Sequence, residues 1–425
     1  MAADSKHVLV VGGGIIGLCV AYYAARKGHR VTVVERGGPD RNGCSLGNAG
    51  MIVPSHFVPL AAPGMVRLGL RMLLNPEGPF AIRPRASADL MHWGWRFVRA
   101  ANAAHVERSA PLLRDLNLRS RCLFKELADE WGGDFGLTRR GLLMLCKTEW
   151  TLREETHVAG SARRLGLPAE VLTPEEAARL ERGVQMDIAG AVYFPQDCHL
   201  DPARFVAELT RALTKHGATF CWSTDVTDWR TDGKRVHAVQ TSRGELTADE
   251  FVLAGGAWSG RAARDLGLFL PLQAGKGYSV TLPTALQRPS ICAILTEARV
   301  AVTPMDGALL RFAGTMEIGG LDTAINRRRV KGMLKSIPRY FPEFQPGDFA
   351  ALPVWAGLRP CSPDGLPYIG RPRLYANLVI ATGHAMMGVS LAPITGKLVA
   401  EIVSDQSPSI KTELLRPDRY ARTPS

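Results

Sequence analysis

The chain of 425 residues is predicted to be an α/β protein in which a doubly wound parallel sheet is joined to an α+β unit with a mixed sheet. Two observations predict this class. Residues 8–35 have the pattern of strand, glycine turn, helix and strand, and strand-like runs alternate with helical stretches over most of the remaining chain. Because the chain has 425 residues, two intertwined domains with ample cores are expected.

The first elements have the spacing of a dinucleotide-binding turn. An apolar run, residues 8–11, leads into Gly12-x-Gly14-x-x-Gly17. The first glycine permits a tight turn, the second lets the backbone approach a pyrophosphate, and the third lets the helix pack on the strand. Glu35 lies 18 residues after Gly17, where its carboxylate can accept both hydroxyls of a ribose. We therefore predict a bound dinucleotide, against the alternative of an ordinary glycine-rich turn.

The helix after this turn is expected to direct its N-terminal amides at the phosphates, because the helix dipole favours an anion there. Ile15 and Ile16 supply such amides, and Arg36 directly follows Glu35. These residues complete the predicted contacts of the first turn with the cofactor.

The next segment is predicted to be a loop. The uncharged run from Asn42 to Val66 is long enough to span a membrane, but Pro54, Pro59 and Pro63 interrupt it. The first strand begins too early to leave room for a signal peptide. The eight cysteines show no CxxC pair and no metal-ligand spacing. We therefore expect reduced thiols in a cytoplasmic protein, and no metal site.

Positive charge is concentrated in residues 61–125, which hold eleven Lys or Arg and four Asp or Glu, a net charge of +7 out of +12 for the chain. Apolar and basic side chains are neighbours on two predicted helical stretches: Val66, Arg67, Leu70, Arg71, Leu73 and Leu74, then Trp93, Trp95, Arg96, Phe97 and Arg99. One interpretation is a surface that rests on anionic lipid. The other is a helical insertion that packs on its own domain. A nucleic-acid partner is not expected, because no recognised binding motif accompanies the charge.

Helix and strand signals continue to the C-terminus. Thr173 is expected to cap a helix with Pro174 at its first position and Glu176 completing a capping box. Asp201 begins another helix, which runs to about Lys215. Strands are expected near 218–222, in 250–260 with its end at Gly255-Gly256, and near 271–283, 308–320 and 378–381. The 308–320 strand is expected to pair with 271–283, and a closing helix follows the last strand.

Several segments together resemble the amine-oxidising FAD enzymes, a family that includes glycine oxidase, sarcosine oxidase and the D-amino-acid oxidases. Besides the first turn they are CSLGNAGMIVPSHFVPLAAPG (44–64), AGGAWS (254–259), GLRPCSPDGLPYIG (357–370) and TGHAMMG (382–388). The resemblance covers about residues 5–405. The SLGNAG stretch is especially similar to bacterial D-amino-acid dehydrogenases, and the closing turn is closer to those acting on D-proline or D-hydroxyproline.

The resemblance implies FAD, held by a discontinuous Rossmann domain of the glutathione-reductase type. A helix starting near Gly388 would point its amides at the pyrimidine edge of the flavin and raise its potential. Some relatives tether the flavin at the position of Gly357, so we expect dissociable FAD here; Cys361 is offset by four residues. Further cofactor contacts are implied at Ser45, Asn48, Ala49, Gly50, Met51, Val226, Gly255, Gly256, Trp258, Gly383, Met387, Gly388 and Val389.

Four residues are the catalytic candidates. Arg359 matches the arginine of the family's GLRP segment, and its planar fork suits a substrate carboxylate; the alternative is a structural salt bridge. Tyr278 matches a strand tyrosine that can join the same carboxylate, unless it only packs. His384 in the closing turn either takes the amine proton or shapes the turn through a hydrogen bond. His56 lies in the loop after the GNAG turn, where relatives place residues near flavin or substrate.

Two further cations are candidates for the site. Lys276 faces the same side of its strand as Tyr278 and is a candidate for raising the flavin potential. Arg311 is either a second anion contact or a solvated or paired charge beside the sheet.

The expected domains are discontinuous. An FAD domain is assembled from about 1–60, 195–260 and 350–405, and a substrate domain from about 61–194 and 261–349, with the basic helical insertion. Residues 406–425 form a tail. The active site is expected between the two domains.

By resemblance, the expected activity is oxidative deamination of a D-amino acid, with hydride transfer from Cα–H to flavin N5 and electrons passed to a quinone or another respiratory acceptor. The expected location is cytoplasmic, with peripheral contact at the inner face of the plasma membrane. Alternatives are an oxygen-using oxidase of the glycine or sarcosine type, the flavin subunit of a heteromeric D-hydroxyproline dehydrogenase, and an FAD-dependent module acting on modified tRNA.

Overall fold

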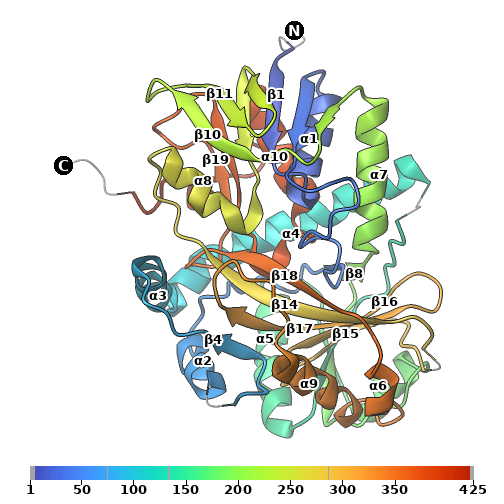
Figure 1. The fold of residues 1–425 in the computed structure, drawn as a ribbon. Coiled ribbons are helices and arrows are strands. Elements are labelled where there is room, and N and C mark those ends of the chain that lie inside the picture. Colours follow the sequence, from blue (N-terminus) through green and yellow to red (C-terminus); the bar gives the residue numbers. More distant parts are fainter. Residues whose placement is uncertain (1–4, 74, 133–134, 286, 422–425) are drawn as a thin grey trace.

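The computed structural model describes residues 5–73, 75–132, 135–285 and 287–421, and its elements are arranged around two large sheets (Figure 1). Leu74, one of the apolar positions in the basic segment, lies outside this description. The first sheet has the order β19-β20-β13-β1-β2-β9, and its pairs are parallel except for β19 with β20. Its strands are β1 (His7–Val11), β2 (Arg30–Val34), β9 (Thr219–Cys221), β13 (Glu250–Leu253), β19 (Tyr368–Gly370) and β20 (Leu378–Thr382).

Both faces of this sheet are covered, because its strands alternate their side chains between two apolar layers. Val8 and Val10 pack in the core formed with α1 (Ile15–Arg26), α7 (Pro202–Lys215) and α10 (Ala392–Val403). Leu9 packs on the opposite face, with the strands β10 (Val226–Thr231) and β11 (Val236–Thr241) and the helix α8 (Ser259–Asp265). The strand β12 (Gly244–Thr247) completes that small antiparallel sheet.

The second sheet is mixed and has the order β18-β14-β17-β16-β15-β5-β7-β6, with β4 attached to β17. The predicted pairing of 271–283 with 308–320 is confirmed, since β14 and β17 are antiparallel neighbours. The strands are β4 (Phe80–Ile82), β5 (Leu142–Cys146), β6 (Glu170–Leu172), β7 (Gly190–Phe194), β14 (Gln273–Leu282), β15 (Cys292–Leu295), β16 (Val300–Pro304), β17 (Leu310–Ile318) and β18 (Val354–Cys361).

Helices surround this second sheet in the lower half of the view (Figure 1). They are α2 (Met65–Leu73), α3 (Ala88–Ala100), α5 (Glu149–Arg164), α6 (Pro174–Leu180) and α9 (Arg327–Ser336), while the long α4 (Ala103–Trp131) crosses between the halves. The two-stranded sheet of β3 (Met51–Ile52) and β8 (Cys198–His199) also lies there. Short 3₁₀ turns cover Gly256–Trp258, Ile337–Arg339, Pro346–Phe349, Ala385–Met387 and Glu413–Leu415.

The local signals in the sequence are confirmed where capping chemistry is strong. Thr173 and Glu176 form the predicted capping box of α6, and Asp201 caps α7, which ends at Lys215 as expected. The closing helix is a correction: a 3₁₀ turn precedes it, and α10 begins at Ala392 rather than near Gly388. Pro393 then occupies its first turn, where the missing N–H costs no hydrogen bond.

Two elements connect the halves more closely than the expected segment boundaries imply. The strand β18 lies within the 350–405 segment but pairs with β14 of the second sheet. The helix α4 lies within the 61–194 segment, yet Leu113, Leu116 and Leu123 pack into the core of the first sheet. The chain therefore crosses between the two halves at the place where the candidate site is built. None of the described helices is both long and apolar enough to cross a membrane.

Candidate active site

The first glycine turn is shaped by contacts that no side chain would permit. Gly12 has φ +113°, and a Cβ there would lie 2.5 Å from the carbonyl oxygen of Ala254, at the end of β13. A Cβ on Gly17 would lie 1.9 Å from the carbonyl oxygen of Gly12. The turn therefore needs glycine at both positions, because helix α1 and two strand ends meet there.

Glu35 stands at the end of β2 with its carboxylate over this turn. Its oxygens accept hydrogen bonds from the amides of Gly13 (2.7 Å) and Gly37 (2.9 Å). Arg41 donates through Nε to the Gly13 carbonyl at 3.1 Å and stacks on Trp222, and the local sequence signals did not single out this pair. Glu35 is thus fixed where a carboxylate can accept ribose hydroxyls.

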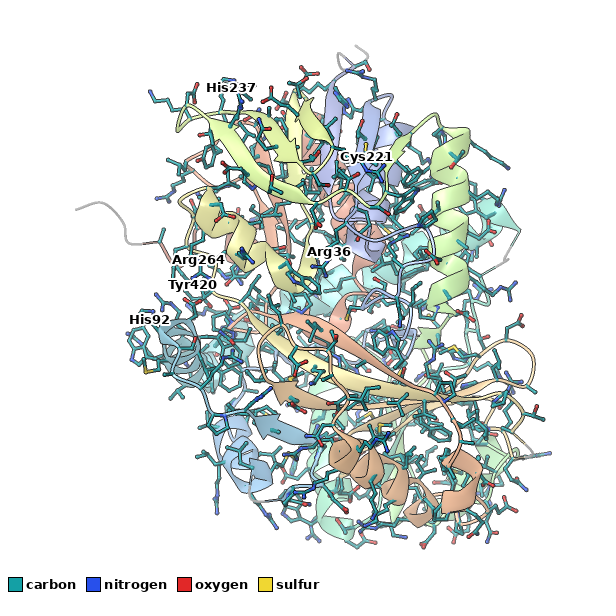
Figure 2. The ribbon with its side chains drawn as sticks, viewed as in Figure 1. Arg36, His92, Cys221, His237, Arg264 and Tyr420 are labelled. Atoms are coloured by element: carbon teal, nitrogen blue, oxygen red, sulfur yellow. The ribbon has the colours of Figure 1, made fainter. Side chains whose placement is uncertain are left out.

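Two other predicted contacts lie on this side of the turn. The guanidinium of Arg36 lies over the Trp258 ring, 3.5 Å from its centroid, and Figure 2 shows Arg36 near the junction of the two halves. Val226 begins β10, two residues after Thr224, whose amide donates to the Glu35 carbonyl at 3.0 Å. Both segments are therefore held beside the acidic end of β2.

The GNAG turn is joined directly to the first helix. Ser45 Oγ accepts from the Ile15 amide at 3.0 Å, next to Ile16 in the first turn of α1. The Asn48 side chain accepts from the Gly50 amide at 2.8 Å. Gly50 has φ +74°, and a Cβ there would collide with the Leu200 carbonyl. Ala49 and Met51 continue the chain and line the pocket described below.

Arg311 donates hydrogen bonds to the backbone of the GNAG turn. Its Nη1 donates to the carbonyls of Leu46 (3.0 Å) and Asn48 (2.8 Å), and its Nε donates to Thr281 at 3.1 Å. Burial lowers the pKa of the Arg311 guanidinium. Of the two alternatives for Arg311, the paired charge is therefore the one observed, because Nη1 donates to backbone carbonyls and Nε to Thr281.

The C-terminal turn is the third turn that lies near the end of the parallel sheet. The Thr382 hydroxyl donates to the Gly256 carbonyl at 3.0 Å, which joins the end of β20 to the Gly255-Gly256 turn. Gly383 has φ +82° and packs against Tyr368. Met387 lines the pocket, and Gly388 and Val389 continue toward α10.

His384 faces the closing helix. Its Nε2 lies 3.0 Å from the Thr395 hydroxyl on α10, and burial lowers its pKa to about 3. The hypothesis that His384 takes a proton from the substrate is not supported by this geometry, because the ring lies under the closing helix. Of the two alternatives, the hydrogen bond that shapes the turn is the one observed.

Together these segments fit FAD. The close approach at Gly12 and the free N-terminus of α1 suit a pyrophosphate, and Glu35 suits the ribose of the adenosine. The GNAG and C-terminal turns continue from there toward the second sheet. A nicotinamide cofactor needs no second binding turn near the C-terminus of the chain.

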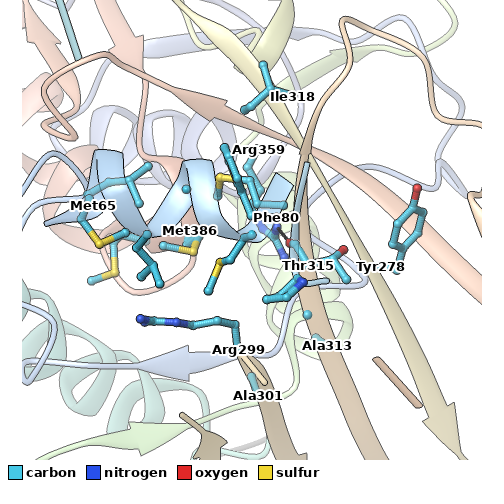
Figure 3. A pocket seen from close by; sticks show the side chains of 18 of the residues that line it. Met65, Phe80, Tyr278, Arg299, Ala301, Ala313, Thr315, Ile318, Arg359 and Met386 are labelled. Atoms are coloured by element: carbon cyan, nitrogen blue, oxygen red, sulfur yellow. Dashed lines mark hydrogen bonds between the residues drawn. The ribbon is translucent and has the colours of Figure 1, made fainter. Parts of the chain in front are cut away.

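Beyond the GNAG turn lies an apolar pocket with a volume of about 450 Å³ (Figure 3). Its walls come from α2, α3, β4, β17 and β18 as well as from the two turns. The polar or charged lining side chains are Cys44, Asn48, His56, Tyr278, Arg299, Thr315 and Arg359. Most of the others are Met, Leu, Ile, Val, Phe or Trp, so the pocket suits a small molecule with an apolar body.

Arg359 is a partly buried cation that lines this pocket. Its Nη1 donates to the Thr315 carbonyl at 2.6 Å, and its guanidinium lies across Gly277, where a Cβ would come within 2.3 Å of it. No carboxylate within the described residues forms an ion pair with Arg359, and burial lowers its pKa. A partly buried arginine that lines a pocket and has no anionic partner among the described residues is well suited to bind a carboxylate ligand.

Tyr278 contributes its ring to the pocket, but its hydroxyl points away from Arg359 (Figure 3). The hydroxyl donates to Glu317 at 3.1 Å and accepts from the Asn326 amide at 3.2 Å. Burial raises the Tyr278 pKa to about 12. Lys276 faces the same region, with Nζ donating to the Ala324 carbonyl at 2.7 Å and lying 3.5 Å from Glu317. The geometry thus joins Tyr278 and Lys276 to Glu317, not to Arg359.

His56 lines the pocket, as does Arg299, a residue that the sequence reasoning missed. Burial and the Arg299 charge lower the His56 pKa to about 4, so the ring is neutral near pH 7. Arg299 extends from the β15–β16 hairpin on the side of the pocket opposite Arg359 (Figure 3). Its sequence context, TEARV, contains no signal that could have distinguished it from other surface arginines.

The basic segment forms part of the entrance. Trp93 is buried in α3 and donates to the Cys361 carbonyl at 2.8 Å, whereas Trp95 is 55% exposed. Arg96 reaches Tyr420, which Figure 2 shows beside the outer edge of this helix. In α2, Leu70 lines the pocket and is 62% exposed. The segment therefore does both: it packs on its own domain and presents apolar side chains to solvent.

Glycine turns that fit FAD, next to an apolar pocket lined by an arginine, indicate a flavin-dependent oxidoreductase. Residues 7–402 match the model of the family described as FAD dependent oxidoreductase (DAO), and the chain belongs to this family. FAD is accordingly its cofactor.

Relatives and solved structures agree with this assignment. The chain is 32% identical to a D-amino acid dehydrogenase of Granulibacter bethesdensis over 98% of this chain and all of the relative. It is 34% identical to the D-amino acid dehydrogenase of Bradyrhizobium diazoefficiens over 97% of this chain and 99% of the relative. Glycine oxidase from Geobacillus kaustophilus is 26% identical and superimposes with a TM-score of 0.77, covering 98% of this chain and 99% of that structure.

Proposed function

We propose that the enzyme oxidises D-amino acids with an apolar side chain and passes the electrons to a quinone. The observation that carries the proposal is Arg359, a partly buried cation without an anionic partner among the described residues, at one end of an apolar pocket. A carboxylate on Arg359 would leave the rest of an amino acid among Met, Leu and Phe side chains. The names of the full-length relatives support a D-amino acid as the substrate.

FAD, when bound, supplies the acceptor for the hydride that leaves Cα–H. The chain's own residues bind and orient the substrate. Arg359 holds the carboxylate through its remaining donors, while its bond to Thr315 keeps the guanidinium in place. The Tyr278 ring and the apolar side chains of α2 and β17 exclude water from the pocket. A cyclic substrate such as D-proline or D-hydroxyproline fits the same proposal, because its carboxylate and apolar ring separate in the same way.

The FAD is proposed to be dissociable. A side chain at position 357 would have its Cβ 2.0 Å from the Trp355 ring, so the indole already fills the space that a tethering residue needs. The Cys361 thiol is buried, and burial raises its pKa to about 12, which makes it a poor nucleophile. Acid precipitation should release the yellow colour into the supernatant, and colour that stays in the pellet contradicts this part of the proposal.

The electron acceptor is inferred from the entrance of the pocket. Exposed Leu70, Met91, Trp95 and Val98 lie on α2 and α3 together with Arg67, Arg71, Arg96 and Arg99. Apolar and basic side chains in this combination bind anionic lipid surfaces, where a quinone is dissolved. The proposed location is the cytoplasm, with peripheral contact at the inner face of the plasma membrane.

An oxygen-using oxidase is the second candidate, because glycine oxidase has the same fold over nearly the whole chain. Initial rates with one D-amino acid should be measured with a soluble quinone and with oxygen alone. We expect rapid quinone reduction and slow peroxide release. Peroxide release that equals the quinone-coupled rate would assign the oxidase instead. Gel filtration tests the remaining alternative, a flavin subunit of a larger complex, by showing whether the active species is the single chain.

A further inference from the structure

A chain of hydrogen bonds leads from the pocket to a buried carboxylate. The Nδ1 atom of His56 lies 2.9 Å from Ser55 Oγ. The Ser55 hydroxyl donates to Asp197 Oδ2 at 2.5 Å, and the Ser55 amide donates to Oδ1 at 3.1 Å. Asp197 is 1% exposed, whereas His56 lines the pocket. We call this arrangement the Asp197–Ser55–His56 chain.

The backbone brings these residues together through a short sheet. Ser55 and His56 follow β3, Asp197 directly precedes β8, and the two strands pair through Met51 and His199. The Gly141 amide donates to the Asp197 carbonyl at 3.0 Å, which fixes the turn that carries the carboxylate. Ser55 is bound to Asp197 by both its amide and its hydroxyl, so its position relative to the carboxylate is doubly determined.

The direction of these hydrogen bonds fixes the tautomer of His56. Ionised Asp197 can only accept, so the single hydroxyl hydrogen of Ser55 is used toward the carboxylate. Ser55 Oγ can then only accept from His56, which places the imidazole hydrogen on Nδ1. Nε2 carries a lone pair, and it has no hydrogen-bond partner among the residues that the structure describes.

We propose that Asp197 and Ser55 are positioning residues that hold His56 in the Nδ1–H tautomer, so that Nε2 accepts a hydrogen bond from the substrate's amine. The inference rests on the proposed function, since it places an amino acid in the pocket. Nε2 as an acceptor orients the amine nitrogen while Arg359 holds the carboxylate. Arg299, which also lines the pocket, disfavours a second positive charge there, so the uncharged amine is the form that this site binds.

The direction of the hydrogen bonds in the Asp197–Ser55–His56 chain depends on pH, because titratable and charged groups surround these residues. Burial raises the Asp197 pKa to about 7, although its bonds to Ser55 and the charge of Arg121 on α4 oppose the increase. Arg299 is the charged neighbour that lowers the His56 pKa, and Glu155 on α5 lies near Arg299. The other titratable groups next to Asp197 are the thiols of Cys198 and Cys292, and burial raises the pKa of each.

Protonation of Asp197 reverses the direction of the hydrogen bonds in the Asp197–Ser55–His56 chain. A protonated carboxyl donates to Ser55, Ser55 donates to Nδ1, and the imidazole hydrogen moves to Nε2. Nε2 would then present a donor to the amine and lose the hydrogen bond. Above the Asp197 pKa the acceptor form predominates, so kcat/KM should fall as the pH is lowered through about 7.

The test compares Asp197→Asn with Ser55→Ala in the holoenzyme labelled with ¹⁵N-histidine. In Asp197→Asn, Oδ1 keeps the bond from the Ser55 amide, and Nδ2 donates to Ser55 Oγ, so the chain is fixed in its reversed direction. Ser55→Ala removes the middle link and leaves Asp197 in place. His56→Gln identifies the His56 signals among those of the ten histidines.

At about pH 8.5, which is above the Asp197 pKa, the wild type should show the hydrogen on Nδ1 and Asp197→Asn should show it on Nε2. Asp197→Asn should lose about tenfold or more in kcat/KM and lose the decrease below neutral pH. Ser55→Ala should show mixed tautomers and a smaller loss. The same tautomer in the wild type and Asp197→Asn, or an unchanged pH profile, would overturn the proposal.

The spectroscopic result does not depend on turnover. If no D-amino acid reduces the flavin although the tautomers follow the expected pattern, the proposed function fails and the Asp197–Ser55–His56 chain remains. If D-amino acids are oxidised but the tautomer of His56 does not respond to Asp197→Asn, the proposed role of the Asp197–Ser55–His56 chain is refuted and the proposed function remains.

Discussion

The dinucleotide end of the site and the pocket end are built from different kinds of information. At the dinucleotide end, glycines and backbone geometry determine the shape of the site, as the approach of Gly12 to the Ala254 carbonyl illustrates. At the pocket end, Arg359, Arg299 and His56 come from three distant segments and meet only in the folded protein. The dinucleotide end depends on glycines, which have no Cβ, whereas the pocket end depends on particular charged and polar side chains.

The largest effect is expected at the dinucleotide end. Gly12→Ala adds a Cβ 2.5 Å from the Ala254 carbonyl at φ +113°, and we expect a loss of about 3–5 kcal/mol of stability together with loss of FAD. Thermal unfolding and flavin content measure this. Gly28→Ala is the matched control, because φ is also positive there but no atom lies within 4 Å. It should cost only about 1–2 kcal/mol and keep the flavin. Equal effects of the two variants would show that close approach is unimportant.

A side-chain deletion at the pocket end should separate binding of substrate from binding of FAD. Arg359→Ala is expected to lower kcat/KM by an amount that corresponds to about 2–5 kcal/mol of transition-state stabilisation, because the substrate carboxylate loses its charged partner. Arg359→Lys should restore part of the loss, since an ammonium lacks the planar fork. Flavin content should stay near that of the wild type. An alanine variant with full flavin and normal efficiency would make Arg359 structural.

The buried carboxyl group of Asp197 should make the free energy of unfolding depend on pH. Burial raises the Asp197 pKa from 3.8 to about 7, so the unfolded chain releases this proton first as the pH rises. The contribution to stability is complete below about pH 4 and is lost as the pH rises through about 7. Asp197→Asn carries no such charge and should be more stable than the wild type by about 2–4 kcal/mol at pH 8, but not at pH 4. Lower stability of the variant at pH 8 would contradict this.

The smallest effect is expected at the entrance of the pocket. Trp95→Ala should weaken binding to anionic vesicles by about 1–2 kcal/mol and leave the melting temperature nearly unchanged. Trp150→Ala is the control, because Trp150 on α5 is 64% exposed but lies outside α2 and α3. Binding should weaken as salt is added, since the arginines contribute to it. If both variants bind as the wild type does, the membrane contact of α2 and α3 is refuted.

The same contrast explains what the sequence could predict. The first turn, the capping box of α6 and the pairing of β14 with β17 were predictable because their signals are local or strictly periodic. Arg359 came from resemblance, since no local pattern distinguishes it from other arginines. The start of α10 was placed too early, because Gly388 resembles a helix start although a 3₁₀ turn precedes the helix.

Side-chain direction was the part that sequence could not supply. His384 and His56 were equally plausible in the sequence, yet one lies under α10 and the other lines the pocket. The resemblance places the Tyr278 hydroxyl at a substrate carboxylate, but the hydroxyl donates to Glu317 and accepts from the Asn326 amide. Arg299, Ser55 and Asp197 gave no signal, because their meaning depends on contacts between segments.

The measurement that tests the account most directly is anaerobic reduction of the bound flavin by a panel of D- and L-amino acids that includes both prolines. We expect bleaching by D-amino acids with apolar side chains, greatly slowed in Arg359→Ala at equal flavin content. Bleaching by L-amino acids alone, or bleaching that Arg359→Ala leaves unchanged, would contradict it.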